Sequence, residues 1–370
     1  MAYQPPVLII GADVAGLTLA QGLCLHSVAF RLFERHPRSR VSQGHRFRIY
    51  EDGRSALDSV LSQQFRLPLR GTAAKKHRFE PRYIDASKLN YSEPTPVDPE
   101  TIPLGRTWIC QLLFLNLDDA IEYEKGFECY EIIDGQVHAK FTDSSIACGR
   151  ILVGADGVKS RVRKQLQPDR KLLDLERWII WGRTPLTVSL QESLPPDLLT
   201  WCMYLDREAN VQAVVEPVVW SRSVSQVSGH RLPDFHNYVY RRLCAAPYQY
   251  GDSLSKTTEE KELYLLVNSA AYELSACVPV MSSKQHIEIR SAAHTGYVTL
   301  VGDAAHPMSP MGGSGADTTV RNVADLAWVI AEEGVTRHTL AQFESRMGER
   351  AKEKIEHSFR GGQKFWRGKE

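Results

Sequence analysis

Apolar residues near the start of the chain form a short unbroken run that is followed by a helical pattern. Residues 7–10 (VLII) are uniformly apolar, which is typical of a parallel strand buried on both faces. The segment GADVAG follows, and residues 17–26 (LTLAQGLCLH) then have helical spacing. A second strand is expected at residues 29–33. The pattern predicts a strand–helix–strand unit with a right-handed crossover.

Two later apolar runs also lead directly into glycine–aspartate segments. Residues 151–153 precede GADGVKSRVR, and residues 298–301 precede GDAAHPMSPMGGSGAD, after which helical spacing returns. Between the first unit and these runs, helical spacing predicts a helix over residues 108–121. Strands at 126–133 and 136–142 would form a hairpin around the turn dipeptide Asp134-Gly135.

The remaining segments differ in character and indicate a second, interleaved domain. Residues 66–106 are rich in proline and charge, and we expect loops and irregular strands there. The block 178–280 is rich in β-branched and aromatic residues, with strands expected at 178–183, 200–205 and 211–220, and a helix at 233–244. We predict an α/β fold with a discontinuous nucleotide-binding domain (1–70, 105–177 and 285–345), a β-sheet substrate domain (71–104 and 178–284), and a C-terminal helix and tail (346–370).

Composition excludes several classes of function. The chain has 370 residues, and 45 Lys and Arg against 44 Asp and Glu give a net charge of +1, so no basic footprint for nucleic acid is present. The seven cysteines occur singly and the twelve histidines lack zinc-site spacing, so we expect a reducing, cytoplasmic setting and no metal. No apolar run approaches the ~18 residues of a membrane span.

The first glycine motif has the setting of a dinucleotide site. Backbone N–H groups from Gly11, Ala12 and Gly16 at a helix N-terminus can hold a pyrophosphate, and Glu34, 18 residues beyond Gly16, can bind a ribose hydroxyl. Asp13 stands where the middle glycine of this motif belongs. Two interpretations stay open: Asp13 weakens dinucleotide binding through its bulk and charge, or it turns outward and caps the helix.

The second and third loops strengthen this interpretation. Taken singly, Asp156-Gly157 and Gly302-Asp303 are typical of tight turns with a helix-capping aspartate. Three such loops in order, each at the end of a buried strand, predict a shared nucleotide site. The segment around Ser314 looks like a nucleophile elbow, but Ala316 stands where that motif requires glycine, which argues against a hydrolase.

Together, GADVAGL with Glu34-Arg35, Arg106 with its following helix, LVGADGVKSRVR and TLVGDAAHPMSPMGGSGAD resemble the class A FAD-dependent monooxygenases. The resemblance to this family, which has the p-hydroxybenzoate hydroxylase fold, spans nearly the whole chain in order and spacing. It implies a Rossmann-like FAD-binding domain with an inserted β-sheet substrate domain. It also implies NAD(P)H as a transient co-substrate, which would share Asp156-Gly157 with FAD.

The resemblance assigns roles to individual residues. Glu34 would bind the adenosine ribose, Arg106 would lie near the flavin phosphate or ribityl chain, Asp303 would contact the ribityl chain, and residues 310–315 would line the isoalloxazine. The implied cofactor-binding set is Gly11, Ala12, Gly16, Glu34, Arg35, Arg46, Arg106, Asp156, Gly157, Gly302, Asp303, Gly313, Gly315 and Ala316.

For the substrate side, Arg183, Tyr204 and His306 are the candidate catalytic residues. Each also has a structural interpretation. Arg183 and Tyr204 would end strands at the domain interface, and His306 would pack the turn before Pro307.

Four positions depart from the pattern of the family that the chain resembles. Besides Asp13, the family's usual asparagine after the glycine-rich loop is Asp317, its usual helical aspartate is Asn322, and Cys110 replaces a common second arginine. We therefore weigh two functions and keep a third in view.

The first function is an FAD-dependent monooxygenase using NAD(P)H and O₂, through a flavin C4a-hydroperoxide. It would hydroxylate or epoxidise an aromatic or electron-rich small organic substrate in specialised metabolism. The second keeps the fold as a non-redox cyclase or isomerase with a degenerate FAD site. The third is a non-catalytic ligand-binding protein, for which the sequence has no specific feature.

Overall fold

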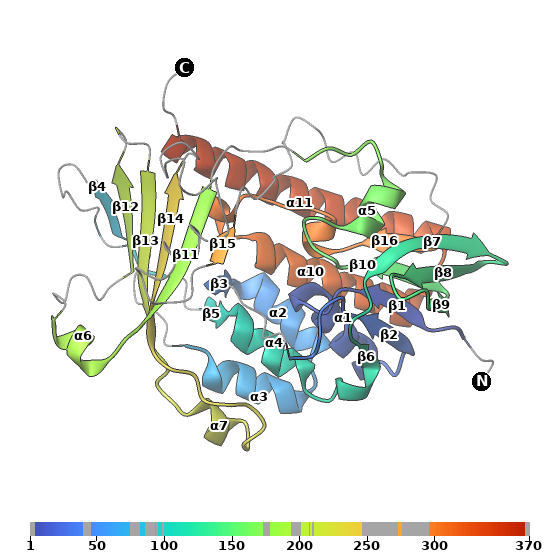
Figure 1. Ribbon diagram of the computed structural model, residues 1–370, viewed down its shortest axis with the longest axis horizontal. Helices are drawn as coiled ribbons and strands as arrows, with labels where there is room; N and C mark the ends of the chain where they lie inside the picture. Colours follow the sequence, from blue (N-terminus) through green and yellow to red (C-terminus); the bar gives the residue numbers. More distant parts are fainter. Residues whose placement is uncertain are drawn as a thin grey trace.

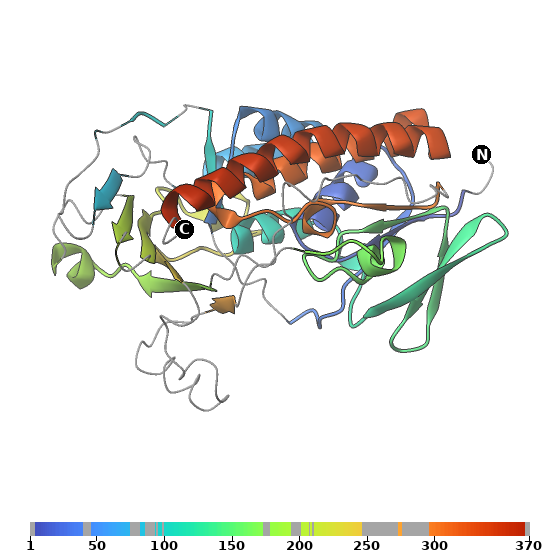
Figure 2. The same ribbon diagram turned by 90° about the horizontal axis from the view of Figure 1, so that it is seen from above.

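The computed structural model of the chain is built around two sheets, one toward each end of the molecule, with helices between them (Figures 1 and 2). It describes residues 4–39, 46–74, 82–85, 93, 95–97, 100–172, 178–193, 201–206, 208, 211–245, 273–275 and 296–366. Among these residues, no helix is long and apolar enough to cross a membrane.

The first sheet is parallel and has the order β16-β10-β1-β2-β6. Its strands are β1 (Val7–Ile10), β2 (Phe30–Phe33), β6 (Ile121–Glu122), β10 (Ile151–Gly154) and β16 (Val298–Leu300). All four residues of β1 are buried, as are all four of β10. The uniformly apolar runs are therefore central parallel strands, as the sequence predicts.

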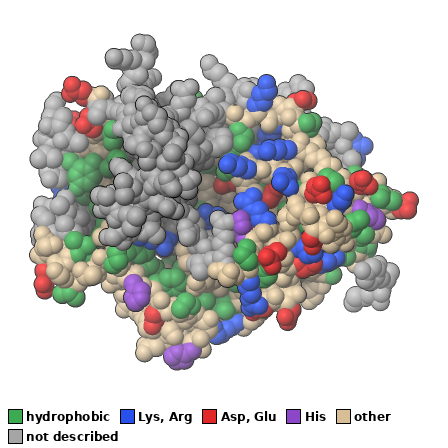
Figure 3. Space-filling view, in the orientation of Figure 1, with side chains coloured by type: hydrophobic (Ala, Val, Ile, Leu, Met, Phe, Trp, Pro, Cys, Tyr) green, Lys and Arg blue, Asp and Glu red, His purple; other side chains and the backbone are tan. Residues whose placement is uncertain are grey.

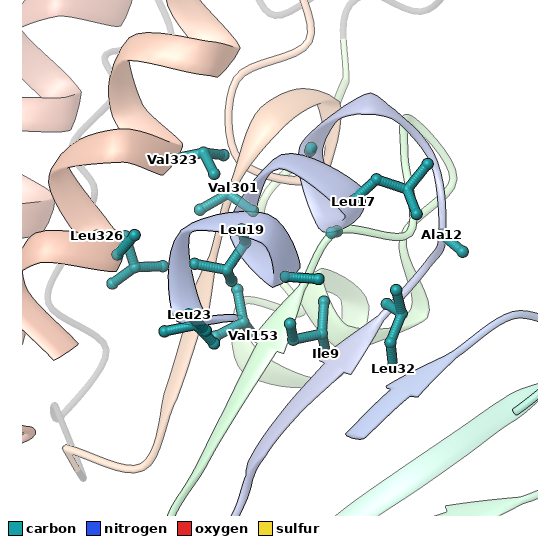
Figure 4. Packing of buried hydrophobic residues seen from close by; sticks show 14 of the residues in the cluster. Ile9, Ala12, Leu17, Leu19, Leu23, Leu32, Val153, Val301, Val323 and Leu326 are labelled. Carbon is teal, nitrogen blue, oxygen red and sulfur yellow. The ribbon is translucent and has the colours of Figure 1, made fainter. Parts of the chain in front are cut away.

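Helices pack on this sheet through one continuous hydrophobic core. The helices are α1 (Val14–Leu25), α2 (Glu51–Val60), α4 (Arg106–Phe114), α10 (Gly315–Trp328), which runs into a π-helical turn (Val329–Glu333), and α11 (Arg337–Trp366). Leu19 and Leu23 of α1 lie between Val153 of the sheet and Leu326 of α10 (Figure 4). The long α11 runs along the outside of the molecule (Figure 2).

A three-stranded antiparallel sheet, β7 (Phe127–Ile133), β8 (Gln136–Phe141) and β9 (Ile146–Gly149), contacts the first sheet through β8 and β9. Its first turn confirms the predicted hairpin. Asp134 and Gly135 have φ of 50° and 75°, the left-handed conformation that such a tight turn requires. A two-stranded ribbon joins β3 (Arg46–Ile49) to β5 (Ile102–Gly105).

The second sheet has the order β15-β11-β14-β13-β12-β4. Its strands are β4 (Arg82–Asp85), β11 (Trp178–Pro185), β12 (Cys202–Asp206), β13 (Val211–Val218), β14 (Tyr238–Ala245) and β15 (Glu273–Ser275). The helix predicted at residues 233–244 is wrong, because β14 occupies most of that segment. Its aromatic and β-branched start, Tyr238-Val239-Tyr240, is buried between β11 and β13, where a pleated strand packs best.

Two further expectations need correction. The proline-rich start of segment 66–106 continues a helix, α3 (Gln63–Thr72), which runs through Pro68 because Phe65 and Leu69 are buried on one face. The helix expected at 108–121 begins at Arg106 and ends at Phe114, with a 3₁₀ turn at Asp118–Ala120. Short helices α5 (Arg161–Leu166), α6 (Val188–Ser193) and α7 (Val224–Val227) lie in connections. The proposed domain limits stay a prediction.

Candidate cofactor and substrate site

The three glycine loops lie next to one another at the carboxyl edge of the parallel sheet. Because β1, β10 and β16 are neighbours in the sheet, the loops that follow them meet at one edge. Backbone bonds tie the loop starts together: Ala155 N–H donates to Ile10 O at 2.8 Å, and Val301 N–H donates to Gly154 O at 2.9 Å. This edge is the position at which open α/β sheets bind nucleotides.

Gly11 and Gly16 are required by the close packing of these loops. Gly11 has a φ of +107°, and a Cβ there would lie 2.5 Å from the carbonyl oxygen of Ala155. A Cβ on Gly16 would lie 1.9 Å from the carbonyl oxygen of Gly11. Both distances are far inside van der Waals contact. A larger residue at position 11 would push the first loop away from the second, and one at position 16 would distort the first loop itself.

Glu34 lies at the end of β2, beside the first loop. Its Oε2 accepts a hydrogen bond from Ala12 N–H at 2.9 Å, and its Oε1 accepts one from His36 N–H at 3.0 Å. The carboxylate is therefore held where a nucleotide ribose would meet this loop. Arg35 points into solvent and donates to the His36 ring at 3.0 Å.

Asp13 caps helix α1 and pairs with Arg106. Its Oδ1 accepts from Val14 N–H at 2.7 Å and from Arg106 Nε at 3.0 Å, and Arg106 Nη2 binds Oδ2 in a second contact. The Cys110 thiol lies 3.5 Å from the same Oδ1. The geometry therefore agrees with the interpretation in which Asp13 caps the helix. Asp13 and Cys110, two of the four positions that depart from the family pattern, are also in contact with each other.

Arg163, which the sequence analysis did not single out, joins the second loop to the third. It is 3% exposed and donates to the carbonyl oxygens of Ala304 at 2.9 Å and Asp303 at 3.3 Å, and also to Val158 O. Burial lowers the pKa of its guanidinium, and the charges of Asp156 and Asp303 oppose this shift. In the sequence, the signal that could have identified Arg163 is its position three residues after Ser160, which caps α5.

The aspartates of the second and third loops have different environments. Asp156 Oδ2 accepts from Arg161 N–H at 2.7 Å and so caps α5. Asp303, in a 3₁₀ turn (Gly302–Ala304), is exposed at the surface. Neighbouring protein atoms displace part of the solvent around its carboxyl and raise its pKa, whereas the charges of Arg106 and Arg163 lower it.

The described residues fit an FAD molecule. A Cβ at Gly157 or Gly313 would meet nothing within 4 Å, so there is open space over the second and third loops. Gly315 and Ala316 begin α10, a 14-residue helix that follows the 3₁₀ turn Pro310–Gly312. The positive, N-terminal end of this helix faces the same region. Among the described residues, Asp13 is the local obstacle, since its charge lies at the α1 N-terminus where a pyrophosphate would bind. Among the described residues, no group of three acids, cysteines or histidines could hold a metal.

Arg46, on strand β3 of the two-stranded ribbon, reaches the second sheet. Its side chain is 2% exposed, and its Nη1 lies 3.2 Å from Glu216 Oε1 on β13. Arg48 Nη2 lies 3.2 Å from the same oxygen. One buried and one partly buried cation therefore share one carboxylate between the β3–β5 ribbon and the second sheet. Contact of Arg46 with a flavin stays a prediction.

A recess of about 240 Å³ lies where the second sheet meets the start of α4. Arg183 is in its lining, together with Tyr238, Trp220 and Phe235. Tyr204 does not line it: it is half-buried on β12, between Ala213 and Ile84 of the neighbouring strands. Of the three candidate catalytic residues, only Arg183 faces this recess.

Comparison with protein families then decides the family. The family model of the FAD binding domain matches residues 134–354, which is more than half of the chain. The chain belongs to the FAD-binding-domain family. Its fold is that of the class A FAD-dependent monooxygenases.

Relatives of this FAD-binding-domain protein include monooxygenases. It is 30% identical, over 378 residues, to the dual O-methyltransferase/FAD-dependent monooxygenase elcB of Phaeosphaeria nodorum, and the match covers 88% of this chain but 40% of that enzyme. It is 26% identical to the FAD-dependent monooxygenase thnD of Trichoderma harzianum, with coverage of 88% and 82%. A crystal structure of a putative FAD containing monooxygenase from Photorhabdus luminescens superposes with a TM-score of 0.75 at 25% identity, covering 98% and 99%.

Asn322, one of the residues that depart from the family pattern, has a hydrogen-bond partner for each polar atom of its side-chain amide in this FAD-binding-domain protein. Asn322 is fully buried; its amide nitrogen lies 2.9 Å from His306 Nε2, and its oxygen accepts from Arg350 Nε at 2.7 Å. Burial lowers the pKa of His306 to about 4, so the imidazole is neutral at pH 7. His306 is 2% exposed and lies outside the recess. This geometry agrees with the turn-packing interpretation, and a contact of His306 with substrate stays a prediction.

The carboxylate of Asp317, another residue that departs from the family pattern, is bound at the start of helix α2. Its Oδ1 accepts from Tyr50 N–H at 2.8 Å, at the positive end of α2. A Cβ on Gly53 would lie 2.1 Å from that oxygen, so glycine makes room for the carboxylate. Desolvation raises the pKa of Asp317, opposed by the bond from Tyr50. The carboxylate is thus directed at α2.

Proposed function

We propose that the chain is an FAD-dependent monooxygenase that oxidises an aromatic or other electron-rich small molecule in specialised metabolism. The observation that carries the proposal is the meeting of three glycine loops at the carboxyl ends of β1, β10 and β16, with Glu34 beside the first. The chain spans less than half of the dual relative elcB, so its activity as a whole is part of this proposal.

FAD, when bound, supplies the redox chemistry: NAD(P)H provides two electrons, one oxygen atom of O₂ enters the substrate, and the other leaves as water. The residues of this chain would bind FAD and orient it. Backbone N–H groups of the first loop and Arg106 would hold the pyrophosphate, and Glu34 would hold the ribose. Arg163 fixes the second loop against the third, and this would hold Asp303 in position near the ribityl chain.

Basic side chains on the surface support the proposal that NAD(P)H binds transiently. Lys and Arg side chains gather on the face that carries α5 (Figure 3), although the net charge of the chain is +1. In this region Lys159, Arg161 and Lys164 are exposed. A dinucleotide carries at least two negative charges, and such a surface would increase its rate of encounter.

The experiment is purification followed by an absorbance spectrum and NAD(P)H consumption. We expect flavin absorbance bands, either directly or after reconstitution with FAD, and NAD(P)H oxidation that an aromatic substrate stimulates. A colourless protein that reconstitution cannot load would refute the proposal. Turnover without flavin or NAD(P)H would instead establish the cyclase or isomerase function, which the monooxygenase relatives do not favour.

A further inference from the structure

His306 lies at the end of the third glycine loop and is linked by hydrogen bonds to two helices. Its backbone N–H donates to Gly302 O at 2.8 Å, directly after the 3₁₀ turn that contains Asp303. Its ring is buried, and Nε2 lies 2.9 Å from the amide nitrogen of Asn322 on α10. The amide oxygen of Asn322 accepts from Arg350 Nε, on α11, at 2.7 Å. A chain of hydrogen bonds therefore runs from α11 through α10 to the loop that carries Asp303.

Arg350 determines the orientation of the Asn322 amide. A guanidinium group has N–H donors and no acceptor, so it binds the oxygen of an amide and not its nitrogen. If the amide were turned by half a rotation, its NH₂ group and the guanidinium would place two donors 2.7 Å apart. Because the oxygen is fixed toward Arg350, the NH₂ group of Asn322 faces His306 and donates to it.

The orientation of the amide decides which ring nitrogen of His306 carries the hydrogen. Nε2 accepts from the NH₂ group of Asn322, so Nε2 has no hydrogen of its own. Burial lowers the pKa of His306 to about 4, opposed by a hydrogen bond with its own backbone, and the ring is neutral at pH 7. A neutral imidazole has one N–H group, which must then be Nδ1–H. Nδ1 is buried and has no hydrogen-bond partner on another residue that the structure describes.

The charges around His306 also favour its neutral form. Burial is the main cause of its low pKa, and the charges of Arg170 and Arg350 lower the pKa further. Arg170 donates to the carbonyl oxygen of the preceding residue in the loop at 2.5 Å. Asp325, on α10, accepts from Arg350 Nη2 at 2.5 Å, so its carboxylate is paired with an arginine. The loop is thus held by arginines on one side and by a neutral imidazole on the other.

We propose that Asn322 and Arg350 are positioning residues that fix His306 as its Nδ1–H tautomer and thereby hold the third loop, with Asp303, in the shape that binds FAD. Asn322 is fully buried and acts through His306. An amide suits this role because one of its atoms accepts from the arginine while the other donates to the imidazole. The proposal deepens the proposed function and rests on it for the binding of FAD at this loop, whereas the tautomer does not depend on FAD.

The first test is nuclear magnetic resonance of the protein as purified, with ¹⁵N-labelled histidine. The signals of His306 are those that do not titrate between about pH 5.5 and 8, above its pKa, and that are absent in His306→Gln. We expect Nδ1 to have the chemical shift of a protonated nitrogen and Nε2 that of an unprotonated one. Asn322→Asp should place a hydrogen on Nε2, because a carboxylate accepts and does not donate. Arg350→Met should give a mixture of tautomers, because the amide is then free to turn.

Arg346→Met is the matched control for Arg350→Met. Arg346 Nη2 also donates to Asp325, at 2.7 Å, but the donor to Asn322 is Arg350. Both variants therefore remove an arginine of α11 that binds the same carboxylate. We expect the tautomer of His306 to stay unchanged in Arg346→Met.

The second test is the Kd of FAD, measured by quenching of its fluorescence. Since a hydrogen bond contributes about 1 kcal/mol, Asn322→Asp and Arg350→Met should each raise the Kd about fivefold, and Arg346→Met should not. A hydrogen on Nε2 in the wild type, or an unchanged tautomer in both variants, would overturn the inference. A changed tautomer with an unchanged Kd would overturn the positioning role.

The two tests separate this inference from the proposed function. If the wild type takes up no FAD but the tautomers follow the expected pattern, the monooxygenase function fails and the tautomer assignment stands. Circular dichroism verifies that each variant folds. If the two variants do not fold, the pH-independent signals of the wild type alone decide the tautomer.

Discussion

Replacing Asp13 with asparagine should tighten the binding of FAD. The Asp13 carboxylate lies at the N-terminus of α1, where backbone N–H groups would hold the pyrophosphate, and it also occupies the guanidinium of Arg106. Asparagine removes the negative charge and releases Arg106. It remains a good helix-capping residue, so the end of α1 is preserved.

The size of the effect follows from the position of the charge. Two unit charges about 4 Å apart interact by roughly 4 kcal/mol at an effective dielectric of about 20. Asp13 and Arg106 are 37% and 34% exposed, so solvent and ions screen much of this repulsion. We expect a gain of about 1–2 kcal/mol, which is roughly a five- to thirtyfold lower Kd. Loss of the partly exposed ion pair should cost less than about 1 kcal/mol of folding stability.

The assay is the quenching of FAD fluorescence on titration with the apoprotein. Asp143→Asn is the matched control, because Asp143, in the turn between β8 and β9, pairs with Lys125 and the change removes the same charge. Arg106→Gln should weaken FAD more in the Asp13→Asn background than in the wild type, since only there is Arg106 free of Asp13. An Asp13→Asn protein that binds FAD no more tightly than the wild type would refute the reasoning.

Three predictions concern stability, each measured by urea denaturation. Burial raises the pKa of Glu344 to about 7. Its folded form therefore retains a proton, and stability should fall by up to about 3 kcal/mol as the pH rises from 4.5 to 8, but not in Glu344→Gln. Asn322→Ala leaves the buried His306 without its partner and should cost about 1–3 kcal/mol; a smaller loss would mean that a water replaces the amide. Gly53→Ala should cost about 1–3 kcal/mol through its clash with Asp317, and Asp317→Ala should relieve most of that cost; additive losses would contradict the clash.

The fold around the cofactor edge could be predicted because its signals are local. Residues 7–10 and 151–153 are apolar at every position, a pattern suited to a strand covered on both faces. The glycine loops follow these strands directly, so placing them at one edge needs only the rules for parallel sheets. The dipeptide Asp134-Gly135 is also a local signal, and it predicts the hairpin between the strands on either side of it.

The remaining features depend on contacts between distant parts of the chain. Whether Asp13 caps its helix or opposes a phosphate depends on Arg106, 93 residues away. The strand β14 was mistaken for a helix because its place between β11 and β13 is not visible in its own residues. The inward position of His306 is likewise decided by Asn322, on a helix that begins after the loop.

The closed ends of the connection between β13 and β14, residues 219–237, make it an exchangeable part. Strands β13 and β14 pair with each other in continuous register up to Val218 and Tyr238, and the loop leaves and returns at that single point. Apart from Arg231 and Leu232, which tie it to the helical part of the molecule, its interior can therefore diverge in sequence or length while the sheet and the cofactor edge stay unchanged. In evolution or in a directed library, residues 221–230 and 233–236 can vary without altering the cofactor edge.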